Sequence, residues 1–195
     1  RENNIPEWFI ESCKKISYLF PRAHAVAYVM MAFRIAWFKV YHPLAFYAAY
    51  FSIRAKAFDL RIMTGDLKTQ LTEFNRIKAL DRAASPKDKD LMSALEVSME
   101  MYQRGYRFIN VDIQHSEARR FSIKDGALLP PFLAIDSLGE TVADAIVEER
   151  NERPFTSLKD LQRRCKVSNT IIDLMKDLKC CGELPEDEQM SLFGA

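Results

Sequence analysis

The chain has 195 residues, 48% of them hydrophobic, which is enough for one large domain or two small ones with a substantial core. Its 28 basic and 27 acidic residues nearly cancel, which excludes nucleic-acid binding through overall charge and leaves only local patches for that purpose. The four cysteines include the adjacent pair Cys180 and Cys181 and show no C-x-x-C spacing, so they favour reduced, buried thiols in the cytoplasm over a disulfide framework or a zinc site.

The N-terminus carries no sign of a secretory signal. Residues 1–4 are polar, and Pro6 directly afterwards begins a first predicted helix. Such an abrupt polar start indicates a fragment of a longer chain.

The next stretch, between Pro21 and Pro43, predicts one long helix, because proline can begin a helix but cannot continue a preceding one. Apolar side chains occupy almost its whole circumference, and Arg34 and Lys39 lie on the less apolar side. This pattern is typical of a buried core helix whose charged side chains reach the surface. The two charges and Pro43 interrupt the apolar run, so we do not expect a membrane span.

Three more helices are expected before residue 105. They cover about 44–54, 67–84 and 86–104, and a connector with a turn at Gly65-Asp66 joins the first two. Leu71, Phe74, Ile77 and Leu80 form the expected inner face of the second. Ser85-Pro-Lys-Asp88 starts the third with a capping serine, a proline at the first helical position and an acidic residue three positions on. All three helices are interpreted as scaffold.

From Tyr106 the pattern alternates between apolar and polar residues. The stretches 106–113 and 120–129 predict strands, and Asp125-Gly126 is a strong hairpin signal. We therefore expect a small two- or three-stranded sheet that ends at Pro130-Pro131 and rests on the helices, because such a sheet is marginally stable alone.

A tight turn followed by a helix lies at residues 135–150. Ser137, Leu138, Gly139, Glu140 and Thr141 would form a hairpin whose helix presents free N–H groups to a DNA phosphate. Serine stands at position 137, where the usual helix-hairpin-helix turn has glycine, and it tolerates a positive φ less well. An ordinary connection between two helices explains these residues equally well.

A second, degenerate hairpin is expected around Val167 and Ser168, with a capped helix after it. Lys159, Arg163, Arg164 and Lys166 form a basic stripe beside it, which is either a DNA contact or a solvated helix face. Residues 184–188 are acidic, contain a proline and are expected to be disordered.

Several motifs together resemble a known family. Phe20-Pro-Arg-Ala-His-Ala, Ala27-Tyr and Ala36-Trp-Phe-Lys-Val-Tyr-His-Pro resemble the fingers of bacterial replicative polymerases, in particular those of the DNA polymerase III alpha subunit of the PolC type. The resemblance extends to the C-terminus. There Gln189, Met190, Ser191, Leu192 and Phe193 resemble the pentapeptide by which replicative polymerases dock on the ring-shaped sliding clamp, with Leu192 and Phe193 as apolar anchors.

The resemblance implies a mainly α fold with four parts. They are a helical fingers part (1–104), a small β connector (105–131), tandem helix-hairpin-helix elements that bind duplex DNA (132–183) and a flexible clamp-binding tail (184–195). It further implies a cytoplasmic parent enzyme, a DNA-directed DNA polymerase of DNA replication, whose partners are template-primer DNA, the incoming dNTP and the clamp, and no membrane.

Site residues follow from the same resemblance. Arg22 and His24, with Arg34 and Lys39 as weaker candidates, would contact the incoming nucleotide or the template, and their role would be electrostatic. The catalytic carboxylates and their Mg²⁺ ions would lie in the palm, N-terminal to this chain. We therefore expect no catalytic residue, metal ligand or cofactor here, and no activity from this fragment alone.

Two other interpretations remain open. The chain could be a non-enzymatic helix-hairpin-helix adaptor that binds DNA and recruits the clamp. A plain helical scaffold is the other, but it leaves the terminal pentapeptide and the hairpin turn without explanation.

Overall fold

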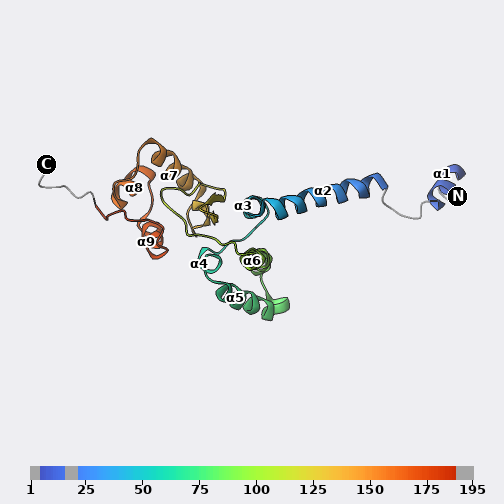
Figure 1. The fold of residues 1–195 in the computed structure, drawn as a ribbon, viewed down its shortest axis with the longest axis horizontal. Coiled ribbons are helices and arrows are strands. Elements are labelled where there is room, and N and C mark those ends of the chain that lie inside the picture. Colours follow the sequence, from blue (N-terminus) through green and yellow to red (C-terminus); the bar gives the residue numbers. More distant parts are fainter. Residues whose placement is uncertain (1–4, 16–21, 188–195) are drawn as a thin grey trace, which may run out of the picture. The chain divides into compact units, whose positions relative to one another are not determined.

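The computed structural model describes residues 5–15 and 22–187 and divides the chain into two compact units, Arg1–His42 and Pro43–Ala195. The first unit holds α1 (Glu7–Lys14) and α2 (Arg22–Tyr41), both shown in Figure 1. Helix α2 fills the interval between the two prolines, as the sequence predicts.

Every residue of helix α2 except the half-buried Lys39 is exposed, and here the predicted burial is wrong. None of its residues is buried, and the side chain of Phe33 is 73% exposed. Apolar character drives a helix into a core only where another surface covers it. By length and composition α2 could also cross a membrane, although the core helix of a larger protein meets the same criterion.

The second unit contains the other helices and the strands that the structure describes. In chain order they are α3 (Pro43–Ile53), α4 (Leu60–Met63), α5 (Leu67–Leu80), η1 (Asp81–Ala83), α6 (Pro86–Gln103), β1 (Ser122–Lys124), β2 (Ala127–Leu129), η2 (Phe132–Ala134), α7 (Glu140–Glu152), α8 (Leu158–Cys165) and α9 (Asn169–Asp177). Helix α4 is one turn inside the predicted connector, and the Asp59 carboxylate caps it by accepting from the Ile62 N–H at 3.0 Å.

Helices α5 and α6 pack against each other, and a polar contact lies between them. The side chain of Gln70 is fully buried; its amide oxygen accepts from Ser98 Oγ at 2.6 Å and its nitrogen donates to the Met63 carbonyl at 3.2 Å. Leu71 and Leu80 were expected inside but are 47% and 36% exposed. Ile77 is buried and Phe74 is half-buried, as expected, so the inner face runs through Gln70, Phe74 and Ile77, and the hydrogen-bonded amide of Gln70 takes the place expected for Leu71.

The start of α6 agrees with the sequence prediction. Ser85 Oγ accepts from the Asp88 N–H at 3.1 Å, and the Asp88 carboxylate accepts from the Ser85 N–H at 3.0 Å. This reciprocal pair forms the predicted capping box. The helix ends before Gly105, which has a φ of 85°.

The sheet has two antiparallel strands, β1 and β2, joined by Asp125 and Gly126 with φ values of 51° and 73°. The third strand expected over 106–113 is reduced to a bridge between Phe108 and Leu128. Phe108 belongs to a core that also contains the fully buried Tyr47 and Leu95, so the sheet rests on the helices as expected.

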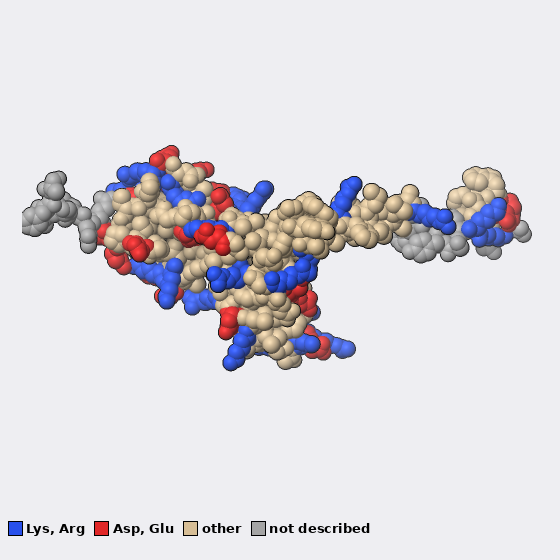
Figure 2. Space-filling view, in the orientation of Figure 1, with Lys and Arg blue, Asp and Glu red and all other residues tan. Residues whose placement is uncertain are grey.

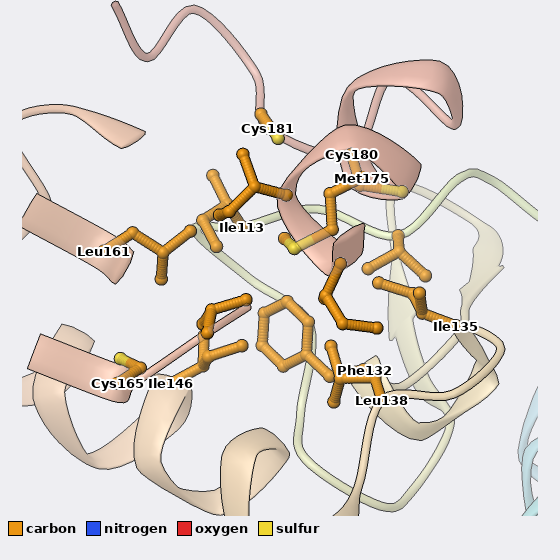
Figure 3. Close-up of a cluster of buried hydrophobic side chains, with 14 of the residues drawn as sticks. Ile113, Phe132, Ile135, Leu138, Ile146, Leu161, Cys165, Met175, Cys180 and Cys181 are labelled. Carbon is orange, nitrogen blue, oxygen red and sulfur yellow. The ribbon is translucent and has the colours of Figure 1, made fainter. Parts of the chain in front are cut away.

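A separate core joins η2 to α7, α8 and α9. Figure 3 shows Phe132 at its centre, with Ile146, Leu161 and Met175 directed toward it from the three helices. All four side chains have an exposed fraction of 0%. This core holds the two turns that precede α7 and α9.

All four cysteines are free, and three of them lie in this core. Burial raises the pKa of Cys165 and of Cys180 to about 12, so these thiols stay protonated at neutral pH. Cys13 is exposed, which corrects the expectation that all four are buried.

Candidate nucleic-acid interface

The first hairpin, between η2 and α7, combines three backbone features. Ser137 adopts a left-handed conformation with a φ of 64°, Leu138 inserts into the core with 5% exposure, and Gly139 caps α7 with a φ of −75° and a ψ of 157°. Serine therefore takes the positive φ for which glycine is usual. Ala143, one turn into α7, is fully buried and allows close packing.

Three N–H groups at the start of α7 have no acceptor among residues 5–15 and 22–187. They belong to Gly139, Glu140 and Thr141, and the Gly139 cap makes no side-chain hydrogen bond. The next two, of Val142 and Ala143, donate to the Gly139 carbonyl at 3.1 and 3.0 Å. Free N–H groups at a helix N-terminus favour a bound anion.

Gly139 itself is not required by the packing of the described residues. A Cβ atom built at this position has no heavy atom within 4 Å, and the backbone angles suit any residue. Glycine is also used where the backbone approaches a ligand closely. The open space beside Gly139 therefore adjoins the start of α7, where the free N–H groups lie.

The second hairpin repeats this geometry between α8 and α9. Lys166 has a left-handed φ of 53°, Val167 is buried with 3% exposure, and Ser168 caps α9 with a φ of −72° and a ψ of 156°. Here the Ser168 hydroxyl accepts from the Ile171 N–H at 3.3 Å. The second helix start is thus partly satisfied by its own side chain, whereas the first is open.

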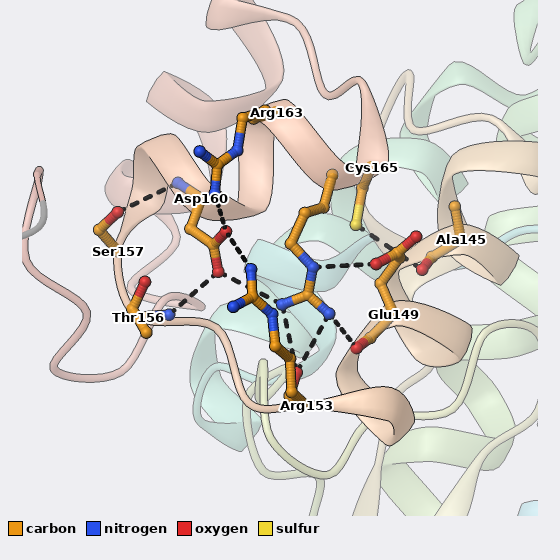
Figure 4. Close-up of polar contacts among 9 residues, drawn as sticks. Ala145, Glu149, Arg153, Thr156, Ser157, Asp160, Arg163 and Cys165 are labelled. Carbon is orange, nitrogen blue, oxygen red and sulfur yellow. Dashed lines mark hydrogen bonds and ion pairs between the residues drawn. The ribbon is translucent and has the colours of Figure 1, made fainter.

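A buried carboxylate, Asp160, connects the hairpins. Its side chain is 0% exposed and receives Arg163 Nη2 at 2.8 Å, Arg164 Nη1 at 3.3 Å and Arg153 Nη2 at 3.3 Å (Figure 4). Burial raises the pKa of Asp160, but hydrogen bonds from Arg163, the Thr156 N–H and Arg164 outweigh it, so the pKa is lowered overall.

Arg164 carries this network to α7. Its Nε donates to Glu149 at 2.9 Å, its guanidinium stacks 4.7 Å from the centre of the Phe155 ring, and the side chain is only 9% exposed. One member of the predicted basic stripe therefore points inward, and Lys159 pairs with Asp187. The stripe is mainly occupied by contacts within the chain.

The loop before β1 supports the first hairpin, and sequence reasoning missed it. Ser116 is fully buried and donates to the Pro130 carbonyl at 2.8 Å, while Arg150 of α7 donates to the carbonyls of Ile113 and Ser116 at 3.1 and 2.8 Å. Desolvation lowers the pKa of Arg150. The sequence holds no short-range signal for these contacts, because their partners are far apart along the chain.

Arg119, at the end of that loop, reaches the first turns of α7. Its guanidinium pairs with Glu140 and, through two nitrogens, with Asp144, with Nε to Asp144 Oδ1 at 3.1 Å. Hydrogen bonding to Arg119 lowers the pKa of Asp144. Glu140 was predicted as a site residue, but Arg119 and Asp144 were not.

The four predicted nucleotide-contact residues all lie on α2, where Arg22, His24 and Arg34 are exposed and Lys39 is half-buried. Arg22 and His24 occupy its first turn and Lys39 its last, and a rise of 1.5 Å per residue separates Arg22 from Lys39 by about 25 Å. Arg34 contacts Met31 Sδ at 4.0 Å. One nucleotide therefore cannot contact all four.

The pentapeptide Gln189–Phe193 lies outside the described residues. Within 5–15 and 22–187, no group of three or more His, Cys, Asp or Glu residues is placed to hold a metal ion. Figure 2 shows basic and acidic side chains mixed over the second unit, while the surface of α2 is largely uncharged.

The tail expected to be disordered is bound to the helices over residues 184–187. The N–H groups of Leu158 and Lys159 at the start of α8 donate to the carbonyls of Pro185 and Glu186 at 2.9 and 3.2 Å. Lys176 of α9 pairs with Glu186 at 2.5 Å, and Lys159 pairs with Asp187. Acidic residues that would repel one another in a free tail are thus held by two lysines.

Comparison with known proteins agrees with this geometry. A profile described as "Helix-hairpin-helix motif" matches residues 105–189, a range that contains both hairpins. The chain is 47% identical over 193 residues, 99% of its length, to the DNA polymerase III PolC-type of Caldanaerobacter subterraneus subsp. tengcongensis. It is also 47% identical over 196 aligned residues to the protein of that name from Streptococcus pyogenes serotype M12. The chain spans 14% and 13% of the length of these two relatives, so it is similar to one segment of PolC-type DNA polymerase III and carries a helix-hairpin-helix motif.

Proposed function

We propose that this chain is the C-terminal part of a bacterial PolC-type replicative DNA polymerase. The observation that carries the proposal is the 47% identity over 99% of the chain to proteins named DNA polymerase III PolC-type. The whole protein would be a cytoplasmic DNA-directed DNA polymerase. Its Mg²⁺ ions and catalytic carboxylates would lie in a palm outside this chain, where the ions activate the 3′ hydroxyl and offset phosphate charge.

The hairpins would hold the duplex by its backbone. The first offers three free N–H groups beside an open glycine, and the second repeats its backbone angles. Contacts of this kind bind phosphates without reading sequence. They would hold the duplex in a fixed position behind the polymerase active site. Catalysis that depends on the positioning of its reactants requires such a fixed duplex.

Helix α2 would belong to the fingers and would be covered by other parts of the polymerase. Its apolar residues, none of them buried here, supply the surface for that packing. Arg22 and His24, together in the first turn, are the pair proposed to face the incoming triphosphate. Arg34 and Lys39 are weaker candidates for contact with the nucleotide or the template.

Residues Gln189–Phe193 would dock on the sliding clamp as an extended peptide with two apolar anchors. Binding of the chain to the clamp, measured with and without its last seven residues, tests this part. We expect binding to be lost with the tail. Clamp affinity that does not depend on the tail would refute the assignment.

Substitution of Gly139 by alanine tests the DNA-binding part. The added methyl group meets no described atom of the protein, and the poorer helix cap and the stiffer unfolded chain oppose each other, so the net change in folding stability should be below about 1 kcal/mol. It would stand where the phosphate approaches, and duplex affinity should fall by about tenfold, equivalent to about 1.4 kcal/mol. Equal affinity of Gly139→Ala and the unmodified chain would contradict a phosphate contact at this hairpin.

A further inference from the structure

Two acidic side chains stand beside the open N–H groups of α7. Glu140 is the first residue of the helix, and Asp144 lies one turn later, about 6 Å along the axis. Both are within one Debye length, about 8 Å at physiological ionic strength, of the helix start. If their negative charges were not compensated, the two carboxylates would repel a phosphate from the helix start, whereas the free N–H groups attract it there.

Arg119 covers both carboxylates. Its Nε and Nη2 bind the two oxygens of Asp144, and its Nη1 binds Glu140. Three of its five donor hydrogens are used in this way, and the side chain is 49% exposed. The positive charge therefore remains at the surface of the hairpin while it compensates the acids.

The backbone before Arg119 is part of the hairpin. The Phe132 N–H donates to the Glu117 carbonyl at 2.9 Å and the Leu133 N–H donates to the Ala118 carbonyl at 3.1 Å. These bonds join the loop directly to η2, the first element of the hairpin. The arginine is thus delivered to α7 by a fixed backbone rather than by a free loop.

Folding stability alone is a weak reason for this arrangement. Both carboxylates are substantially exposed, at 64% for Glu140 and 36% for Asp144, and exposed ion pairs contribute little to stability. An electrostatic effect on a bound anion is larger, because the anion adds its own charge to the same small region.

We propose that Arg119 is a positioning residue of the DNA interface, which neutralises Glu140 and Asp144 so that a duplex phosphate can occupy the N-terminus of α7. This inference rests on the proposed DNA-binding function of the hairpins. According to this inference, a residue outside the hairpin controls the access of a phosphate to it.

The test is duplex DNA binding by the whole chain, measured by fluorescence anisotropy at low and at physiological salt. We expect Arg119→Ala to weaken binding by about tenfold at low salt and less at higher salt, because the uncovered charges are screened. The triple variant R119A/E140Q/D144N removes the same ion pairs but also the repulsion. It should recover affinity to within about threefold of the unmodified chain.

Arg76→Ala is the matched control. Arg76 is another exposed arginine that binds one carboxylate, Glu73, through two nitrogens and touches a second, Asp88, but it lies on α5. Its loss should leave DNA affinity unchanged. Urea unfolding of Arg119→Ala and of the triple variant should show that both remain folded under the binding conditions.

The outcomes separate the two proposals. The role of Arg119 would be overturned, with DNA binding intact, if the unmodified chain binds duplex DNA and Arg119→Ala binds it with equal affinity. It would also be overturned if the triple variant binds as weakly as Arg119→Ala. An unmodified chain that binds no duplex would overturn both.

Discussion

Ser137 and Lys166 occupy equivalent positions in the two hairpins and share a left-handed backbone, with φ values of 64° and 53°. Each is followed by a buried apolar residue, Leu138 or Val167, and then by the cap of the next helix. The positive φ turns the chain sharply enough to insert that apolar residue and to start the helix at once.

Replacement of Ser137 by glycine should stabilise the chain. A left-handed conformation costs a residue with a Cβ about 1–2 kcal/mol, and glycine avoids this but has a more disordered unfolded state. We expect a net gain in the free energy of unfolding of about 0.5–1 kcal/mol, measured by urea denaturation. Ser137→Ala keeps the Cβ and should give no gain; an equal gain in both variants would show that φ is not the cause.

Loss of Asp160 should destabilise the second unit strongly. Its carboxylate is the buried acceptor for three arginines, and Arg164 would be left partly uncompensated in a nearly buried position. Removal of one member of a buried pair costs about 3–5 kcal/mol, and we expect Asp160→Ala to fall near the lower limit because Glu149 still binds Arg164. Urea denaturation at pH 7 measures this.

The same carboxylate predicts a pH dependence. The pKa of Asp160 is lower in the folded chain than its ordinary value near 4. Its ionic contribution is therefore fully present above the unfolded pKa and is lost as the pH falls through the lower folded pKa. Between pH 6 and pH 3 the unmodified chain should lose more stability than Asp160→Asn, and parallel curves would exclude this group as the cause.

The bound tail segment should stabilise the second hairpin. Residues 184–187 satisfy two N–H groups at the start of α8 and join α8 to α9 through Lys159 and Lys176. Truncation after Glu183 should therefore lower the free energy of unfolding by about 1–3 kcal/mol, at about 0.5–1.5 kcal/mol for each of the two lost hydrogen bonds. Truncation after Glu188 removes the pentapeptide but keeps these contacts, and it should leave stability unchanged.

Local signals account for the parts of the fold that sequence reasoning predicted correctly. The Ser85–Asp88 capping box satisfies its own backbone groups, and the Asp125-Gly126 turn needs two adjacent residues with a positive φ, so a few consecutive residues determine each feature. The two hairpins were found for the same reason. Their left-handed turns and caps are also formed within four or five consecutive residues.

The errors concern contacts between distant residues. Gln70 is buried in place of Leu71 only because Ser98 and Met63 satisfy its amide. Likewise, the acidic tail residues are held because folding brings Lys159 and Lys176 to them. From composition alone, a glutamine is expected to be exposed and neighbouring acidic residues are expected to repel one another. The partners that allow Gln70 to be buried and the acidic residues to be bound are adjacent only in the folded chain.

The exposed α2 leads to a last prediction, on association. All the described buried hydrophobic residues lie between Tyr47 and Cys181, so the second unit should fold without residues 1–42. Along α2, by contrast, Val29, Phe33 and Val40 are 54%, 73% and 63% exposed, and an apolar surface of this kind promotes association in water. We expect the 195-residue chain to form dimers or larger species as its concentration rises, and the chain of residues 43–195 to remain monomeric. Sedimentation at a series of concentrations measures both.

Phe33→Glu in the full chain provides the matched control, because it interrupts the apolar surface without changing the length of the chain. This variant should associate less than the unmodified chain. Equal association of all three chains would place the contact in the second unit instead.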